Sequence, residues 1–387
     1  MRKKFATIFI CFIIMFSKTP FATKLYDNRD VTMYKGDVSA SVFNEYKNNE
    51  QDATLPVKIL GVTIKNINLI EDKCVYLGGQ TVGIAMYTKG LLVTDIITIE
   101  NDEGELITPG TLAGIKKGDY LLKANGIELD DVSNMDAILK ASKGENINLT
   151  VSRNNKVFDT KITPVKNKKD GLFRLGLWMR DSAAGLGTIT YIDPENKTFM
   201  ALGHSICDSD TGQMLNVKDG RVVECIITGI KKGEKGKAGE LKGTFGVNAE
   251  QLGTITNNTK FGIIGKNMSL NTETMITVAS KEAIVEGKAY IYSDFETGTV
   301  KPYEIEIVHI NDQTYPCEKS MVIKITDQEL IEKTGGIVQG LSGSPIVQND
   351  RLIGAVTHVM INDSTRGYGI FIENMLQINQ ENINSAA

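Results

Sequence analysis

Residues 340–347 read Gly-Leu-Ser-Gly-Ser-Pro-Ile-Val, and residues 351–357 continue as Arg-Leu-Ile-Gly-Ala-Val-Thr. Glycines on both sides of a serine let the backbone turn sharply, so that the hydroxyl is exposed and successive amides point toward one place. We therefore predict Ser342 as a nucleophile, with an oxyanion hole made by the amides of Gly340 and Ser342. A purely structural glycine–serine turn is the alternative interpretation, and the apolar hairpin after the turn favours the nucleophile.

A serine nucleophile needs a base, and the chain contains three histidines, His204, His309 and His358. His204 follows a strand-like run and a glycine, a usual place for a rigidly presented catalytic side chain. His309 lies in an alternating run that is typical of a surface strand. His358 either lines the substrate cleft or packs as a core imidazole. We predict His204 as the base.

The composition favours β structure and excludes several classes of partner. Glycine is frequent at 37 of 387 residues, whereas there is one tryptophan and there are eight prolines. The formal charge of -4 gives no basic footprint for nucleic acid. No metal-ligand spacing and no phosphate- or dinucleotide-binding fingerprint occurs, so neither a metal nor a cofactor is predicted. The glycine- and lysine-rich stretch 230–246 is interpreted as a mobile surface loop.

The first residues have the plan of a signal peptide. Met-Arg-Lys-Lys precedes an apolar run at 5–16, so residues 1–22 predict export across a membrane, with a retained signal anchor as the alternative. Residues 23–55 are polar and irregular, which favours an exposed tether; a strand at 38–42 packed on the body is the alternative. Four cysteines of an exported chain fit two disulfides or free thiols equally well, namely Cys74, Cys207, Cys225 and Cys317.

Residues 110–134 combine a Lys-Gly-Asp turn, an Asn125-Gly126 hairpin and an amphipathic helix that Ser133 can cap. This stretch resembles a PDZ domain, and the resemblance covers about residues 75–165. It implies a peptide ligand, or the chain's own N-terminal segment, bound as an added strand. The binding loop would then lie at Thr81, Val82, Gly83 and Ile84. A core strand after a glycine turn is the alternative for these four residues.

Beyond Lys169, short strand-like runs recur at the spacing of a barrel or sandwich. The segment around Ser342 resembles the Gly-Asp-Ser-Gly-Gly-Pro segment of chymotrypsin-like peptidases, from which Leu341 and Ser344 depart. Together with the PDZ-like stretch, three segments closely resemble the SpoIVB (stage IV sporulation protein B) peptidase family: residues 201–208, 334–345 and 354–358, with 367–369 downstream.

The family resemblance implies a mainly β fold with minor α content, in which a PDZ domain precedes a chymotrypsin-like double β-barrel at 170–387. It also implies Asp327 as the third catalytic residue. Spacing alone does not select this acid, because chymotrypsin-like enzymes place theirs much further ahead of the serine, and Asp208, Asp294 and Asp312 are rivals. Asp327 is alternatively the N-cap of a helix at 328–332.

The resemblance further implies a specificity pocket bordered by Thr357, His358, Val359, Gly367, Tyr368 and Gly369. The implied function is an exported serine endopeptidase that cleaves itself within the tether and also cleaves a membrane-bound regulator of σ-factor processing, between forespore and mother cell. A catalytically inactive PDZ adaptor that binds a membrane protein is the alternative. A quality-control protease of the high-temperature-requirement type is disfavoured, since its PDZ domain follows the peptidase domain.

Overall fold

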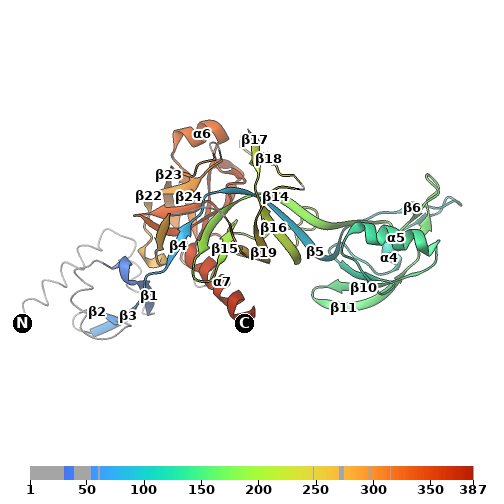
Figure 1. The fold of residues 1–387 in the computed structure, drawn as a ribbon, viewed down its shortest axis with the longest axis horizontal. Coiled ribbons are helices and arrows are strands. Elements are labelled where there is room, and N and C mark those ends of the chain that lie inside the picture. Colours follow the sequence, from blue (N-terminus) through green and yellow to red (C-terminus); the bar gives the residue numbers. More distant parts are fainter. Residues whose placement is uncertain are drawn as a thin grey trace, which may run out of the picture.

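The computed structural model describes residues 30–38, 54–59, 62–246, 248–269, 274–295, 298–313 and 315–386. The predicted leader at 1–22 and most of the predicted tether at 23–55 lie outside these ranges. Strands far outnumber helices along the described chain, which confirms the mainly β prediction (Figure 1). Within the same ranges, no helix combines the length and the apolar character needed to span a membrane.

The first barrel is a closed antiparallel ring in which each strand pairs with the next and the last returns to the first. In ring order its strands are β5 (Thr81–Ile96), β14 (Leu177–Asp193), β15 (Thr198–Ala201), β20 (Gly262–Lys266), β19 (Gln251–Thr259) and β16 (Val217–Val223). Their inward side chains, including Ile84, Phe199 and Ile263, form one buried apolar cluster. Because the ring closes, most of its strands are hydrogen-bonded to a neighbour on both sides and present no free sheet edge.

The second barrel closes in the same way with another six strands. In ring order they are β22 (Gly287–Ser293), β23 (Lys301–Ile310), β24 (Met321–Ile325), β28 (Asp363–Phe371), β27 (Arg351–Met360) and β26 (Pro345–Gln348). Ile291, Ile305 and Ile323 lie in its core. Two six-stranded barrels side by side are the predicted chymotrypsin-like architecture, which is therefore confirmed.

A third apolar cluster joins the two barrels. It contains Tyr191 of the first barrel, Ala355 of the second, and Met375 of helix α7 (Ile372–Ala386), all fully buried. Two short strands, β4 (Cys74–Leu77) and β21 (Met275–Val278), pair with each other and cross this junction. Burial of large side chains between the barrels fixes their relative position, and the cleft described below depends on it.

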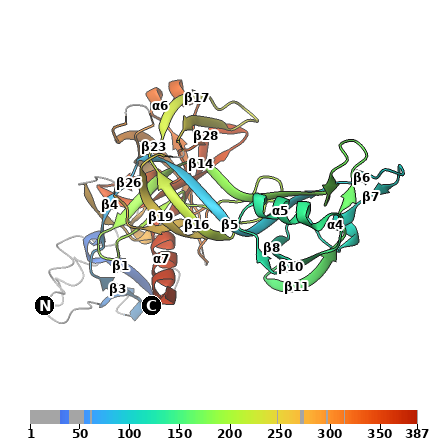
Figure 2. The same ribbon diagram turned by 45° about the vertical axis from the view of Figure 1, so that its right-hand side comes forward.

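The PDZ-like unit is inserted between β5 and β14 of the first barrel. These two long strands leave the barrel together and continue into the unit (Figures 1 and 2). The remaining elements of the unit are β6 (Ile99–Glu100), β7 (Leu106–Ile107), α4 (Pro109–Leu112), β8 (Tyr120–Ala124), β9 (Ile127–Glu128), α5 (Val132–Ser142), β10 (Ile147–Arg153), β11 (Lys156–Ile162), β12 (Val165–Lys166) and β13 (Phe173–Arg174). The sequence resemblance assigned residues 75–88 to the PDZ domain, but residues 76–77 and 81–88 pair with the barrel strands β14 and β16.

Local sequence signals in the PDZ-like unit behave largely as expected. Asn125 and Gly126 have φ angles of 49° and 80°, the left-handed conformations that a tight hairpin between β8 and β9 requires. The helix predicted after Ser133 is α5, but its N-cap is Asp131, whose carboxylate accepts a hydrogen bond from Asn134 N. The capping prediction was therefore wrong by two residues, because helix α5 begins one residue ahead of Ser133.

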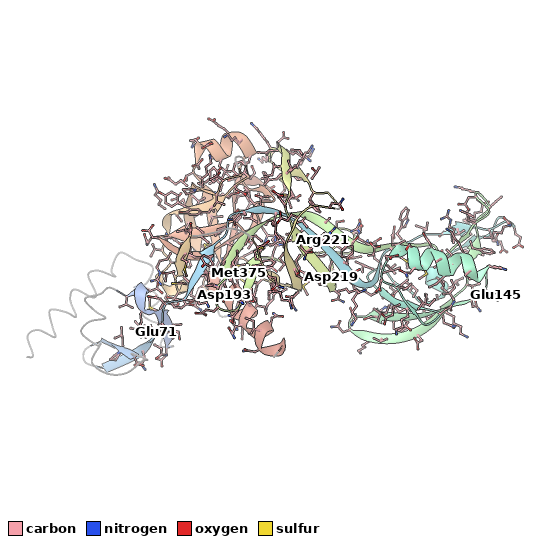
Figure 3. The ribbon with its side chains drawn as sticks, in the orientation of Figure 1. Glu71, Glu145, Asp193, Asp219, Arg221 and Met375 are labelled. Atoms are coloured by element: carbon pink, nitrogen blue, oxygen red, sulfur yellow. The ribbon has the colours of Figure 1, made fainter. Side chains whose placement is uncertain are left out.

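A small three-stranded sheet precedes the barrels, made of β1 (Val31–Tyr34), β2 (Thr54–Ile59) and β3 (Val62–Ile70), with the 3-10 helix η1 (Lys35–Asp37) after β1. Glu71 and Glu145, labelled in Figure 3, mark this end of the molecule and the far end of the PDZ-like unit. The described part of the predicted tether therefore lies against the body. The four cysteines of the described chain are all free thiols.

The stretch 230–246 is not a loop, which corrects the prediction made from its glycine content. It contributes to the hairpin β17 (Ile226–Lys231) and β18 (Gly239–Thr244), and β18 pairs with β25 (Val338–Gln339) just ahead of Ser342. Gly239 explains one of the glycines, since a Cβ there would meet Lys231 O at 2.6 Å and Gly233 N at 2.4 Å. The last elements are η2 (Lys281–Ala283) and α6 (Gln328–Thr334).

Candidate active site

A cleft of about 830 Å³ lies where both barrels and the β17–β18 hairpin meet. Six of the residues predicted for the peptidase site line it: His204, Gly340, Ser342, Thr357, His358 and Val359. They come from segments more than 130 residues apart in the chain. The structure thus brings the predicted nucleophile, base and oxyanion-hole residues to one solvent-accessible place.

Ser342 lies in the turn between β25 and β26, which is possible only with glycine on both sides. Gly340 and Gly343 have φ angles of 102° and 94°. A Cβ on Gly343 would stand 2.1 Å from Thr188 O, so strand β14 presses directly against this turn. Two buried hydroxyls of β14 hold the turn as well, since Thr188 Oγ1 donates to Gly340 O and Thr190 Oγ1 donates to Gly343 O, each at 2.8 Å.

The hydroxyl of Ser342 donates to Thr357 O at 2.9 Å. In the described part of the chain, Ser342 makes no hydrogen bond with His204, and the amides of Gly340 and Ser342 donate to no protein group. Unpaired amides beside a nucleophile are what an oxyanion hole requires. The site is therefore open toward a substrate carbonyl, with the serine hydroxyl resting on the main chain of β27.

The tautomer of His204 follows from its surroundings. Its Nδ1 lies 2.8 Å from Ser205 O, and a carbonyl can only accept a hydrogen bond, so Nδ1 must carry the hydrogen. This leaves Nε2 with a free lone pair, the form that a general base needs. Leu202 and Gly203, both with positive φ angles (72° and 69°), turn the chain so that the ring enters the cleft.

His358 is the second imidazole of the site. Its ring centroid lies 4.9 Å from that of His204, at an interplanar angle of 40°. Its Nδ1 is buried without a hydrogen-bond partner. Burial, with the nearby His204 and Lys319 charges, lowers the pKa of His358 to about 4. His358 is therefore neutral near pH 7 and carries no proton to transfer there.

Asp327 has a different setting from the one that the family resemblance implied. It is the N-cap of α6, where its carboxylate accepts from Leu330 N at 2.9 Å and from Glu304 N at 3.4 Å. Across the described ranges, no hydrogen bond or ion pair joins Asp327 to His204. The helix-capping interpretation accounts for the carboxylate, and the acceptor that orients His204 is the carbonyl of Ser205.

The rival acids also have partners away from His204. Asp208 is buried and forms an ion pair with Arg180. Asp294 accepts from Thr81 N at 2.7 Å. Asp312 is exposed. None of the four acids considered from the sequence thus contacts the predicted base, so the site is built around a serine, a histidine and main-chain groups.

The predicted pocket residues divide into two sets. Thr357, His358 and Val359 of β27 line the cleft, whereas Gly367–Gly369 lie one strand behind on β28, where Gly367 pairs with Val359 and Tyr368 with His358. A Cβ on Gly367 would meet His358 O at 2.4 Å, so this glycine allows β28 to approach closely. The second set supports the pocket wall and does not line it.

The predicted PDZ peptide-binding loop is corrected by the strand pairing. Thr81, Val82, Gly83 and Ile84 form part of β5 and pair with β14 on one edge, and Gly83 and Ile84 pair with β16 on the other. Gly83 and Ile84 therefore offer no open edge for an added peptide, and Ile84 instead lines the peptidase cleft. The core-strand alternative describes these residues.

An open edge does occur at the other end of β14. Leu177–Ser182 pair with β5 alone among the described strands, and helix α5 lies alongside, with Val132 N donating to Asp181 Oδ2 at 3.1 Å. The sequence signal that could have located this edge is Arg174-Leu175-Gly176-Leu177, a basic residue ahead of a Gly-Leu-Gly-Phe-like run. This signal follows the PDZ-like stretch in the chain, where a binding loop ahead of that stretch would not be sought.

Sequence reasoning also missed the third wall of the cleft. Ala238 and residues 240–243 of the β17–β18 hairpin line it, with Leu241 buried and Glu240 and Lys242 beside it. Their glycine-rich context concealed the strand pattern. The described residues contain no group of three or more histidine, cysteine or acidic side chains that could hold a metal ion.

Comparisons with known proteins agree with this geometry. The family model of SpoIVB peptidase S55 matches residues 171–376, more than half of the chain, and a PDZ domain model matches 108–153. A Bartonella henselae protein named "Probable periplasmic serine endoprotease DegP-like" is 30% identical over 192 residues, which cover 43% of this chain and 37% of that protein. A Lactococcus lactis protein named "Putative zinc metalloprotease LL2128" is 37% identical over 70 residues, 18% of this chain and 16% of that protein. The chain thus spans less than two fifths of either relative.

Proposed function

Because the chain belongs to the SpoIVB peptidase S55 family, a family of serine peptidases, we propose that it is an exported endopeptidase that acts through Ser342 and His204. The observation that carries the proposal is the shared cleft, in which a glycine-flanked serine, two unpaired amides and an imidazole with a free Nε2 lie together. A serine, a base and oxyanion donors are the minimum set for acyl transfer to water.

In the proposed mechanism, substrate binding moves the Ser342 hydroxyl from Thr357 O toward His204 Nε2. The hydroxyl oxygen attacks the peptide carbonyl while Nε2 accepts its proton, and the Gly340 and Ser342 amides bind the developing oxyanion. His204, now an imidazolium, donates its Nε2 proton to the leaving amine, which departs and leaves an acyl-enzyme. Water then attacks the acyl carbon while Nε2 accepts its proton, and this proton passes to the Ser342 oxygen as the acyl–oxygen bond breaks and the acid product leaves. Ser205 O holds the Nδ1 hydrogen throughout and is the orienting acceptor.

The proposed substrates are proteins: the chain itself within residues 23–55, and a membrane-bound regulator of σ-factor processing during spore formation. The family description and the predicted leader support this assignment. At the PDZ-like unit, we propose that a peptide adds to the free edge of β14 at Leu177–Ser182, with its carboxylate near Gly176. Gly176 has a φ angle of 66°, so its amide is presented from a turn ahead of the strand.

The decisive experiment is labelling by a fluorophosphonate probe, read by mass spectrometry of the labelled peptide. The wild-type chain should be labelled at Ser342, and the Ser342→Ala and His204→Ala chains should not be labelled. N-terminal sequencing of the wild-type and Ser342→Ala chains from cells should then locate self-cleavage. Absence of labelling in a folded wild-type chain would favour the inactive PDZ adaptor, for which the resting bond from Ser342 to Thr357 O is the supporting observation.

A further inference from the structure

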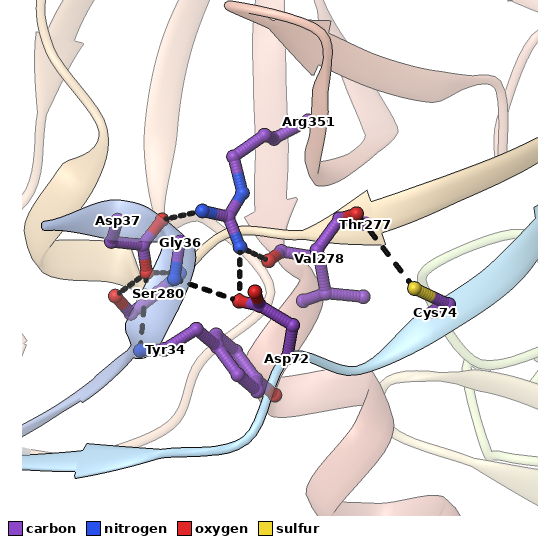
Figure 4. A network of polar contacts seen from close by, with 9 residues as sticks. All are labelled: Tyr34, Gly36, Asp37, Asp72, Cys74, Thr277, Val278, Ser280 and Arg351. Carbon is purple, nitrogen blue, oxygen red and sulfur yellow. Dashed lines mark hydrogen bonds and ion pairs between the residues drawn. The ribbon is translucent and has the colours of Figure 1, made fainter. Parts of the chain in front are cut away.

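One buried acid ties the segment at residues 30–38 to the second barrel (Figure 4). Asp37, whose side chain is fully buried, accepts hydrogen bonds from the amide of Ser280, at 2.9 Å, and from its hydroxyl. Asp37 also forms an ion pair with Arg351 at 2.9 Å. Arg351 in turn contacts Asp72 Oδ1 at 3.1 Å and donates to Val278 O.

The same segment is held by its main chain and by one apolar side chain. Strand β1 pairs in parallel with β3, from Val31 with Ile67 to Tyr34 with Ile70. Met33 is 6% exposed and packs in a cluster with Leu55, Ile67 and Leu69. Main-chain pairing, an alternating apolar anchor and a terminal charge are how an added strand is recognised by a sheet edge.

Gly36 shows how closely the segment fits. Its amide donates to Asp72 Oδ1 at 3.0 Å, and a Cβ at this position would meet Arg351 Nη1 at 2.7 Å and Asp72 Oδ2 at 2.9 Å. A larger residue here would have to displace the Arg351 guanidinium or the Asp72 carboxylate. The contact is therefore shaped for this particular sequence.

All the partners named above for the segment at residues 30–38 lie at position 55 or later in the chain. None of these contacts depends on the covalent connection through residues 39–53. We propose that the surface formed by β3, Asp72, Ser280 and Arg351 is a docking site for residues 31–37 that keeps this segment bound, without a covalent link, when the chain is cut between residues 38 and 54. Whatever precedes residue 30 then stays attached to the peptidase after the cut.

The buried ion pair sets the specificity of docking. A buried charge that loses its partner is strongly unfavourable, since it has given up its hydration. An N-terminal segment that carries Asp37→Asn leaves Arg351 with one acid instead of two, and gives up the charge-assisted bonds to Ser280. We expect this change to weaken docking at least about tenfold.

The proposal does not depend on catalysis, so the experiment uses the full chain with Ser342→Ala. A recognition sequence for a site-specific protease replaces part of residues 39–53, and an affinity tag is placed at the N-terminus. After cutting, the two fragments are separated by size-exclusion chromatography and identified by mass spectrometry. The dissociation constant is then measured by exchange of a labelled synthetic peptide of residues 30–38 into the cut protein.

The fragments are expected to co-elute, and the Asp37→Asn peptide should exchange in at least about tenfold more weakly than the wild-type peptide. Thr32→Ala is the matched control, because Thr32 is exposed on the same strand, and it should bind almost as well as the wild type. These substitutions lie in the peptide, so they cannot unfold the body. Release of the wild-type fragment upon cutting, or equal binding of the Asp37→Asn peptide, overturns the proposal.

Discussion

The imidazole ring of His358 lies against that of His204, with 4.9 Å between the ring centroids, and both face the cleft that contains Ser342. One of the two rings is neutral near pH 7, since the pKa of His358 is lowered to about 4 by burial and by the nearby His204 and Lys319 charges. A neutral ring can restrain its neighbour without competing for protons. The first two predictions follow from this pair.

His358→Ala should lower kcat about tenfold or more with little change in KM, because the His204 ring loses the surface that restrains it. His358→Phe keeps a ring in the same place and should retain most of the activity. In both variants the shape of the pH–rate profile should stay that of the wild type, because His358 does not take part in proton transfer. Equal losses in the Ala and Phe variants would instead assign a chemical role to a nitrogen of His358.

The depressed pKa of His358 also predicts how stability depends on pH. Between about pH 6.5 and pH 4 the unfolded chain binds a proton at this position and the folded chain does not. The free energy of unfolding should therefore fall as the pH falls through this range, by at most about 3 kcal/mol from this group. Urea titrations of wild type and His358→Phe at pH 7 and pH 4.5 measure the difference, and identical pH slopes would contradict the prediction.

Glu373 should make the free energy of unfolding depend on pH in the opposite direction, so that stability falls as the pH rises toward neutral. Burial, followed by repulsion from Glu282, raises its pKa to about 7, so the folded chain holds a proton there that the unfolded chain has lost above about pH 4.5. Stability from this group therefore falls as the pH rises from 4.5 to 7. Glu373→Gln should raise the thermal midpoint at pH 8 and leave it nearly unchanged at pH 4.5. A lower midpoint at pH 8 would mean that the carboxylate makes a favourable contact.

Asp327 can be tested as a helix cap with two substitutions. Asp327→Ser retains an N-cap side chain and should stay close to the wild type in stability, whereas Asp327→Ala should cost about 1 kcal/mol. If the carboxylate serves only helix α6, the Ser variant should also cleave at near wild-type rate. A Ser variant that is stable but has lost most of its kcat would restore Asp327 to the catalytic group.

The side chain of Thr188 should couple strand β14 to the turn that contains Ser342. Thr188→Val removes the buried hydroxyl that binds Gly340 O, so the Gly340 carbonyl loses its partner and Gly340, whose amide is a predicted oxyanion-hole donor, loses a restraint. Stability should fall by about 1–3 kcal/mol and kcat about tenfold or more. Thr190→Val is the control, because it removes the bond to Gly343 O, on the far side of Ser342 from the predicted oxyanion hole. We expect the two variants to lose similar amounts of stability, and Thr188→Val to lose more kcat than Thr190→Val.

The sequence predicted the residues whose role lies in local backbone geometry. Gly340 and Gly343 indicated the turn at Ser342, because a sharp turn needs left-handed φ angles, and Asn125-Gly126 indicated its hairpin for the same reason. The scarcity of histidines selected His204. Such signals are short-range and can be recognised in one stretch of chain.

The missed features depend on contacts between distant segments. Ile84 belongs to the first barrel only because Gly185 and Val222, about 100 or more residues later, pair with it. The orienting partner of His204 is a main-chain carbonyl, which any residue type supplies. The wall at Ala238 and residues 240–243 lies in a glycine-rich stretch, where composition conceals a strand that is stabilised by β25.

Strand β14 runs without interruption from the free edge beside α5 to the cleft, where Leu186 is part of the wall. At about 3.3 Å per residue, Leu177 and Leu186 are about 30 Å apart. A substrate whose C-terminus is bound beside Leu177 can present for cleavage only a bond that lies at least nine or ten extended residues upstream of that C-terminus. Under the proposed docking at this edge, the length of β14 would select substrates by the distance between the C-terminus and the scissile bond as well as by side chain.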